Sequence, residues 1–176
     1  MTEPTETTEV TGPADGDDTS ATEVVVRARG HENVSAAHAS TLELTSESFL
    51  TPAGNCILGI EADRTPADFP EAFREACRSA DARITATLEV RDRAAGSDYA
   101  SRTDRADRTE HVETITGRGH PDLTFADETS MVIRTSEYVD DRTVMVGAGT
   151  AAGDIGRNLV DRLAAGGDLR LTLRVR

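Results

Sequence analysis

The chain has 176 residues and a formal net charge of −13, and all 19 of its Lys and Arg positions are Arg. A chain of this length can bury the hydrophobic core of one domain. Its excess of acidic residues argues against nucleic-acid binding, which needs a basic surface. No apolar run is long enough to span a bilayer, and the N-terminus lacks the pattern of a secretion signal. We therefore expect a soluble, cytoplasmic protein that binds neither nucleic acid nor membrane.

The absence of Lys, together with abundant Asp, Thr and Ala, is typical of proteins that stay soluble in multimolar salt. Carboxylates hold water and cations there, while charge repulsion is screened within a few ångströms. We interpret the composition as that of a haloarchaeal, cytosolic protein. Cys56 and Cys77 form no spacing motif, and we expect both to be free thiols in a reducing compartment.

The N-terminal segment, residues 1–22, has acidic residues but no basic residue and very little to bury. A segment of this composition is expected to be a disordered tail that aids solubility. Its six acidic residues are Glu3, Glu6, Glu9, Asp15, Asp17 and Asp18.

The next part of the chain predicts strands and one helix. A β-branched run at 24–26 is followed by an alternating strand at 41–45 and a more buried strand at 56–60. Thr65 then opens a helix as its N-cap, with Pro at the first position. A second alternating strand at 84–90 closes the unit.

The same unit recurs after a polar linker at 93–110. A shift of 89 residues aligns Arg29-Gly30-His31 with Arg118-Gly119-His120, and apolar positions further along match in the same order. We therefore predict a β-rich α+β protein made of two tandem β–β–α–β repeats, residues 24–92 and 111–176.

Neither repeat is large enough to bury both faces of its own sheet. We expect the two repeats to pack about an approximate two-fold axis. The result would be one sandwich or jelly-roll-like domain, residues 23–176, with two helices covering its ends.

The repeated Arg-Gly-His motif has a structural and a functional interpretation. In the structural one, Gly30 and Gly119 permit a bulge or a corner, and the flanking Arg and His bind nearby backbone carbonyls. In the functional one, His31 and His120 meet near the two-fold axis and bind an anion or a metal ion. His38 would add a third imidazole, although this spacing is not a known metal signature.

Other motifs favour ordinary structural roles. The glycines at 147 and 149 resemble a phosphate-binding turn, but the first repeat lacks them and no further strand–helix–strand series follows to form a nucleotide crevice. Cys56 precedes an apolar strand and is more typical of a buried thiol than of a nucleophile. Asp140-Asp141-Arg142 is typical of a tight turn closed by an ion pair, with anion binding by Arg142 as the alternative.

Several segments resemble an archaeal protein family, domain of unknown function 371. They are Arg29-Gly30-His31, His38, 41–45, 50–60, Gly119-His120-Pro121 and Asp141-Arg142-Thr143. The resemblance spans about residues 24–175 and implies a β-rich, jelly-roll-like fold without an assigned activity. The family favours Asp-Cys where this chain has Asn55-Cys56, which argues against a mechanism that needs a carboxylate at position 55.

The leading functional hypothesis is a domain that binds a small anion or a protein partner in a polar cleft at the repeat junction. The predicted ligand-binding residues are Arg29, His31, His38, Arg118, His120 and Arg142. One alternative is a metal-dependent enzyme that uses His31, His38 and His120. A structural or assembly protein is the other. The sequence leaves open whether the protein is an enzyme and which cofactor or metal it binds.

Overall fold

The computed structural model describes residues 22–93 and 111–176. The elements are β1 (Glu23–Arg29), β2 (Thr41–Thr45), β3 (Ile57–Gly59), α1 (Glu71–Cys77), β4 (Arg83–Arg91), β5 (His111–Arg118), β6 (Ser130–Arg134), β7 (Thr143–Met145), α2 (Arg157–Ala164) and β8 (Asp168–Val175). Apart from one border residue each, the expected tail over 1–22 and linker over 93–110 lie outside the described residues. Within those residues, neither helix has the length and apolar character needed to cross a bilayer.

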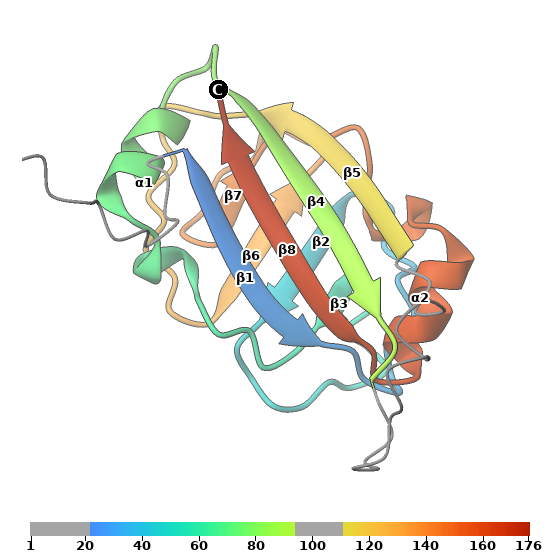
Figure 1. Cartoon of the computed structure of the whole chain (residues 1–176). Coiled ribbons are helices and arrows are strands. Elements are labelled where there is room, and N and C mark those ends of the chain that lie inside the picture. The colour runs from blue at the N-terminus through green and yellow to red at the C-terminus, as the bar shows by residue number, and fades with distance from the viewer. Residues whose placement is uncertain (1–21, 94–110) are drawn as a thin grey trace, which may run out of the picture.

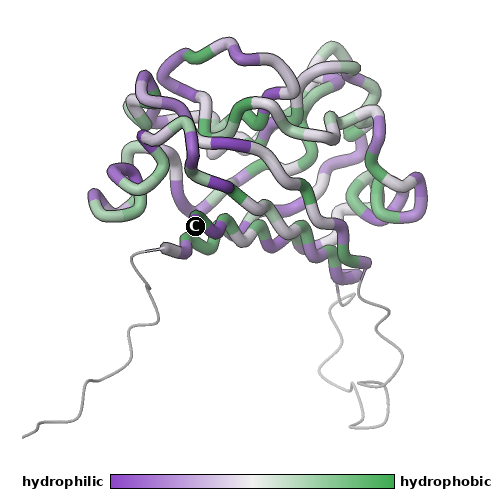
Figure 2. The backbone as a smooth tube through the Cα atoms, turned by 90° about the horizontal axis from the view of Figure 1, so that it is seen from above, coloured by the Kyte–Doolittle hydropathy of each residue, from purple (hydrophilic) through white to green (hydrophobic). Residues whose placement is uncertain are grey.

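The described part of the chain is β-rich α+β, with two four-stranded sheets and two α-helices (Figure 1). Sheet A has the order β1-β8-β4-β5 and is antiparallel throughout. Sheet B has the order β3-β2-β6-β7, with an antiparallel pair at its centre and a parallel pair on each side. The two sheets lie in separate layers, and the helices cover opposite ends (Figures 1 and 2).

The strands of sheet A form because their apolar residues alternate with polar ones. Ile84, Ala86, Leu88 and Val90 of β4 are buried, while the residues between them are partly or fully exposed. β8 has the same alternation, and Figure 2 shows it as alternating hydropathy along the strands. Each strand therefore buries one face against sheet B and exposes the other to solvent.

The first helix begins later than the sequence predicts. Thr65 does precede a turn, and its backbone N–H donates to Asp68 Oδ2 over 2.9 Å, but residues Pro66–Asp68 form only a 3-10 turn. The α-helix starts at Glu71, directly after Pro70. Pro70 lacks an N–H and favours an extended residue before it, so the first turn cannot continue into the helix.

Each half of the chain has three strands before its helix, where the sequence predicted two. The β-branched run at 24–26 belongs to the full seven-residue strand β1, and β5 opens the second half in the same way.

Each helix packs against the loop that follows the edge strand of the other half of the chain. Arg78, just after α1, donates its Nε to Leu123 O over 2.8 Å. Arg157, at the start of α2, donates to Ala36 O over 2.9 Å. The rings of Phe69, just before α1, and Phe73, within α1, pack against Phe125 of the second half. The two halves are thus interlocked.

The glycines of the Arg-Gly-His motif lie where these helix ends meet the sheet edges. A Cβ on Gly30 would lie 1.9 Å from Leu163 O, and one on Gly119 would lie 2.1 Å from Cys77 O. Neither glycine has a positive φ. These residues are therefore glycine because the backbone of the other half approaches too closely for a side chain, and the predicted bulge or corner is not the reason.

Candidate functional site

The first motif, Arg29-Gly30-His31, lies at the end of β1. The Arg29 backbone N–H donates to Ile60 O over 3.0 Å, and its guanidinium forms an ion pair with Glu61. The hydrogen bond that Arg29 Nε donates to the Glu61 carboxylate is the main reason why the pKa of Glu61 is lowered. His31 Nδ1 accepts a hydrogen bond from Asn33 N over 3.0 Å and so closes its own turn.

The second motif, Arg118-Gly119-His120, repeats this arrangement at the end of β5. The Arg118 backbone N–H donates to Val146 O over 2.8 Å, and its guanidinium forms an ion pair with Glu137. His120 Nδ1 accepts from Asp122 N over 3.0 Å. In both motifs, the Arg side chain pairs with a carboxylate, and the His side chain accepts a hydrogen bond from a backbone N–H. The sequence analysis had expected both side chains to bind backbone carbonyls.

The two motifs do not converge. β1 and β5 are opposite edges of sheet A and run antiparallel, so their ends occupy diagonal corners of the sheet. Strand spacing and rise place these corners about 30 Å apart. The prediction that His31 and His120 meet at the axis is therefore wrong, and these residues do not line one polar cleft.

His38 and Arg142 lie in loops that lead into sheet B, and not at the two corners of sheet A that hold the motifs. His38 Nδ1 accepts from Thr41 N over 3.1 Å, just before β2. The Arg142 guanidinium pairs with Asp140 Oδ2 over 3.0 Å, just before β7. Across the described ranges 22–93 and 111–176, His, Cys, Asp and Glu side chains form no group of three that could hold a metal ion.

Replacing His31 and His120 by Ala should therefore only lower stability. Each imidazole closes one local turn, and each substitution should cost about 1 kcal/mol of unfolding free energy. Because the two sites are far apart, the costs should add in the double variant. Denaturant titration of the two single variants and the double variant measures this. A strongly non-additive double variant would instead indicate that the two histidines are coupled.

Cys56 lies next to Glu43 of β2, with its Sγ donating to Glu43 Oε2 over 3.4 Å. Burial, followed by the charge of Glu43 and this hydrogen bond, raises the pKa of Cys56 to about 11. A thiol with this pKa holds little of the thiolate that acts as a nucleophile near neutral pH.

Alkylation of Cys56 by iodoacetamide at pH 8 should be about 100-fold slower than that of an ordinary exposed thiol. Glu43→Gln should accelerate it, because the substitution removes a charge that opposes ionisation. Mass spectrometry of the Cys56 peptide over time measures the rate. Equal rates in the two proteins would show that Glu43 does not control this thiol.

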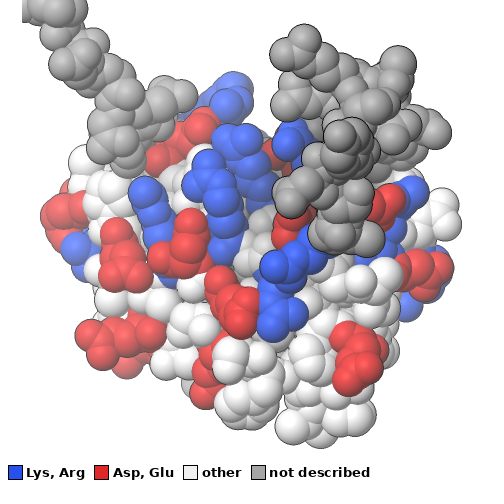
Figure 3. Space-filling view, turned by 60° about the horizontal axis from the view of Figure 1, so that its bottom comes forward, with Lys and Arg blue, Asp and Glu red and all other residues white. Residues whose placement is uncertain are grey.

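The outward face of sheet A gathers arginines that the sequence analysis did not connect. Strand alternation places seven Arg there against three acidic residues. We call this surface the Arg face. Its arginines are Arg27, Arg29, Arg83, Arg91, Arg118, Arg170 and Arg174, and its acids are Glu23, Glu89 and Asp168. Figure 3 shows Arg side chains in a band across the molecule.

Threonines occupy the middle of the Arg face. Thr87 of β4 pairs with Thr172 of β8 on one side and with Thr114 of β5 on the other. Thr85 and Thr116 form a second cross-strand pair. The face thus presents hydroxyl groups at its centre and guanidinium groups toward both ends.

The ion pairs on the Arg face are loose or exposed. Arg170 Nε lies 3.8 Å from Glu89 Oε2, and Arg174 pairs with Glu23 near the edge of the sheet. Arg27, Arg29 and Arg118 face carboxylates from outside the strands, namely those of Asp63, Glu61 and Glu137. Exposed pairs of this kind contribute at most about 1 kcal/mol, so a carboxylate from outside can replace them. Arg27, Arg91 and Arg170 also line a hollow of about 400 Å³ at one end of the face.

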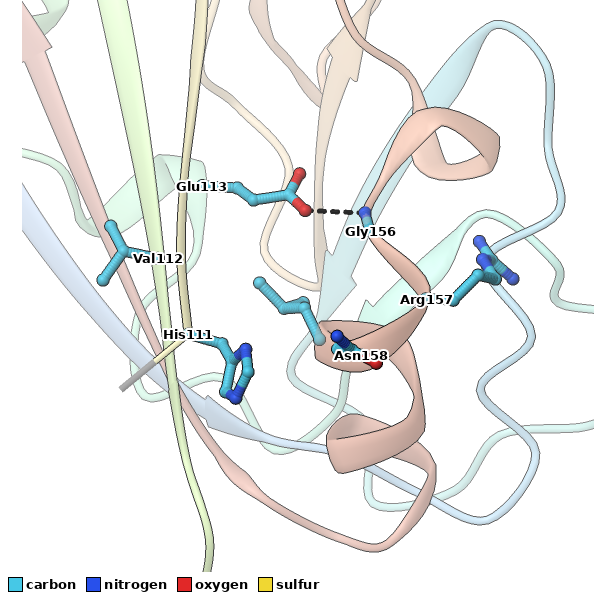
Figure 4. Close-up of a pocket in the computed structure, with 7 residues that line it drawn as sticks. His111, Val112, Glu113, Gly156, Arg157 and Asn158 are labelled. Atoms are coloured by element: carbon cyan, nitrogen blue, oxygen red, sulfur yellow. Dashed lines mark hydrogen bonds between the residues drawn. The ribbon is translucent and has the colours of Figure 1, made fainter. Parts of the chain in front are cut away.

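A separate pocket of about 280 Å³ lies between β5 and α2 (Figure 4). Glu113 Oε1 accepts from Gly156 N over 2.6 Å at the start of α2. His111 points toward the helix, while Arg157 points away from the pocket. Among the described residues His111 Nε2 is buried without a hydrogen-bond partner.

The sequence held a signal for the Arg face but not for this pocket. Arginines recur at every second or fourth position along the strands, as at Arg27 and Arg29 on β1 and at Arg170 and Arg174 on β8. With a period of two, such residues must share one face. His111 and Glu113 are 43 or more residues from α2 in sequence, and no local pattern connects them to it.

Comparison with known proteins shows the family to which this chain belongs. The family model for domain of unknown function 371 (DUF371) matches residues 26–176. The chain belongs to this family. The resemblance inferred from the sequence is thus confirmed.

The chain also resembles a protein from a methanogenic organism over most of its length. An uncharacterized protein of Methanocaldococcus jannaschii is 41% identical over 147 residues, which cover 84% of this chain and 95% of that protein. The DUF371 match includes all eight strands from Val26 onward and both helices. It therefore includes all seven arginines of the Arg face, and the family carries no assigned function.

Proposed function

We propose that this DUF371 protein is a non-enzymatic binding module whose Arg face docks a carboxylate-rich surface of a protein partner. The gathering of seven Arg on one sheet face, in a chain of net charge −13, carries the proposal, since the carboxylates that pair with them are exposed and can be replaced. Elsewhere in the described residues, Asp and Glu outnumber Arg about two to one. Arg forms bidentate pairs with carboxylates, and Thr hydroxyls can add hydrogen bonds.

A protein partner fits the Arg face better than a nucleic acid or a membrane. The face holds no aromatic side chain on which bases could stack. Its two apolar residues, Val25 and Val112, offer little to insert into lipid. Arg is enriched in protein–protein interfaces, and a flat sheet face suits such a contact.

The metal-dependent alternative has no comparable support. It requires His31, His38 and His120 together, and their positions at two corners of sheet A and on sheet B oppose this. The assembly alternative agrees with the present proposal, because both involve a protein partner.

For the fold, we propose two tandem repeats about an approximate two-fold axis within one sandwich-like domain, residues 23–176. The pairings of Thr87 with Thr172 and of Glu43 with Val132, at the centres of the two sheets, support this symmetry. We also propose a salt-adapted, cytoplasmic protein from its composition. Carboxylate-rich neighbours are expected there, since proteins soluble in high salt are generally acidic.

The test is binding of a fluorescent ten-residue peptide of alternating Glu and Ser, followed by anisotropy at the lowest KCl concentration that keeps the protein folded. The Arg27→Gln and Arg170→Gln double variant should bind roughly tenfold more weakly than the wild type. The control is Arg64→Gln and Arg74→Gln, which removes the same charge outside the Arg face. It should stay within about twofold of the wild type.

Three results would count against the proposal. The first is equal loss of affinity in both double variants, which would indicate a general charge effect. The others are tighter binding of an oligouridylate of equal charge, or of vesicles containing phosphatidylglycerol, than of the acidic peptide. A peptide with Gln in place of Glu should not bind.

A further inference from the structure

We propose that the free edge of β5, together with the side of α2 that faces it, binds an extended segment of another protein that carries a basic side chain. The bound segment extends sheet A by one strand. This site is separate from the Arg face, and the inference does not rest on the proposed function of that face.

The backbone of β5 has hydrogen-bonding groups that no neighbouring strand uses. Thr116 O accepts from Gly149 N over 3.1 Å, and Arg118 N donates to a carbonyl outside sheet A over 2.8 Å. The even-numbered residues of β5 therefore turn their N–H and C=O groups away from β4. The same groups of Val112 and Thr114 point outward and have no hydrogen-bond partner in the described ranges. Such unpaired groups at a sheet edge are a template for another strand.

Two hollows beside β5 give the segment room. His111, Val112 and Glu113 line the pocket of about 280 Å³, although Figure 4 shows Val112 pointing away from α2 and the other two toward it. Because side chains of a strand alternate, all three residues line one pocket only where it opens at the edge of the strand. A hollow of about 430 Å³ is also lined by His111 and Asn158, so the two hollows adjoin. They form one groove between β5 and α2.

One side of α2 forms the opposite wall of this groove. The residues that line the larger hollow from this side are Asn158, Asp161, Arg162 and Ala165. Their spacing of three and four places them along one stripe of the helix. His111 Nε2 is buried on the strand side, with no hydrogen-bond partner among the residues that the structure describes. Buried polar atoms are normally paired, so a ligand in the groove has an unsatisfied nitrogen to bind.

The charges along the groove favour a basic side chain. Arg162 pairs with Asp92, and Arg157 donates to two backbone carbonyls of the loop after β1 and points away from the pocket. The carboxylates of Glu113 and Asp161 form no ion pair within residues 22–93 and 111–176, although Glu113 accepts a backbone N–H from the start of α2. A Lys or Arg side chain neutralises these two carboxylates, whereas an acidic side chain is repelled by them.

Val112 indicates which residue stands next to the basic one. Its side chain is 50% exposed on the solvent face of β5, where nothing lies beside it on the edge side. An added strand places one of its residues directly opposite, and a β-branched residue there forms a favourable cross-strand pair. The neighbouring residue of the segment then points toward α2. The expected segment therefore alternates apolar β-branched residues with a basic residue.

The first test measures binding of an end-blocked fluorescent peptide, Ser-Thr-Val-Arg-Val-Thr-Ser, to the full chain by anisotropy. Thr114→Pro should weaken binding roughly tenfold, because proline lacks the outward N–H and pairing with β4 does not use it. The control is Val25→Pro on β1, the opposite edge of sheet A, where the N–H also points outward. It should stay within about twofold of the wild type. Equal weakening by both substitutions would overturn the inference.

The second test varies the peptide and uses the wild-type chain, so it does not depend on how the proline variants fold. A peptide with N-methyl groups at alternate residues cannot donate to the edge of β5 and should bind at least about tenfold more weakly. A peptide with Glu in place of Arg should bind about tenfold more weakly, and Asp161→Asn should reduce this preference about threefold. Equal binding of the N-methylated and unmodified peptides would contradict strand addition.

Hydrogen exchange locates the bound peptide. The amides of Val112 and Thr114 point outward and should exchange rapidly in the free protein, then roughly tenfold or more slowly when the peptide is saturating. The amide of Val25 should not change. Binding without protection of Val112 and Thr114 would place the peptide elsewhere and overturn the inference. Dimerisation of the free chain that Thr114→Pro abolishes would also overturn it, because a second copy would then occupy this edge.

Discussion

Gly30→Ala should prevent the protein from reaching its native fold. The new Cβ would lie 1.9 Å from Leu163 O, an atom of the backbone that cannot rotate away as a side chain could. Relieving the overlap requires α2 to separate from the end of β1. We expect a loss of about 4 kcal/mol or more, a large part of the stability of a typical domain. Gly119→Ala should destabilise the protein to a similar extent, because its Cβ would lie 2.1 Å from Cys77 O.

Gly149→Ala is the matched control for these substitutions. A Cβ at Gly149 meets no heavy atom within 4 Å, so this variant should unfold at nearly the wild-type denaturant concentration. Circular dichroism during denaturant titration compares all three variants. A stable, native Gly30→Ala protein would mean that the end of β1 and α2 are not in contact.

Asp140→Asn should cause the next largest loss of stability. Arg134 of β6 is almost buried, with 9% of its side chain exposed, and its guanidinium binds Asp140 Oδ2 over 2.9 Å. The Asp140 carboxylate also accepts a hydrogen bond from Thr143 Oγ1 over 3.0 Å. Without the carboxylate, Arg134 is left with no opposite charge, and the unfolding free energy should fall by on the order of 3 kcal/mol.

The pH dependence gives this prediction a second test. Burial favours the neutral acid, but hydrogen bonds from Arg142, Arg134 and Thr143 outweigh it and lower the pKa of Asp140 to about 2. Because the folded pKa is below the unfolded value, the stabilisation is complete above pH 4 and is lost as the pH falls toward 2. The stability difference between wild type and Asp140→Asn should shrink over this range.

Asp141→Asn is the comparison for Asp140→Asn. Asp141 is exposed and accepts a hydrogen bond from Thr124 Oγ1, so its loss should cost less than about 1 kcal/mol. If the two substitutions destabilise the protein equally, the buried guanidinium of Arg134 does not depend on Asp140.

Much of the secondary structure could be predicted because it depends on local patterns. Alternation at 41–45 and 84–90 identified β2 and β4, each to within a residue or so. The starts of the helices could not be predicted in the same way. At Thr65 the local signals for a helix N-terminus are present, but Pro70 ends the first turn and shifts the helix start to Glu71.

The candidate site was harder to predict because it depends on strand order. The sequence analysis singled out Arg29 and Arg118 as repeated residues, yet it predicted that their motifs meet, whereas they lie at diagonal corners of sheet A. Which strands are edges follows from long-range pairing, such as that of β1 with β8, and no local pattern specifies this. The same strand order brings Arg27 and Arg170 into register and so forms the Arg face.

The interlocked halves also determine when the protein can fold. β1 pairs along its whole length with β8, so the first strand must wait until the last residues of the chain have been synthesised. α1 likewise needs the loop around Leu123 and Phe125 from the second half. Contacts this distant in sequence make folding slow. The nascent first half exposes apolar strand faces on the ribosome until the second half arrives, which makes it a natural substrate for chaperones.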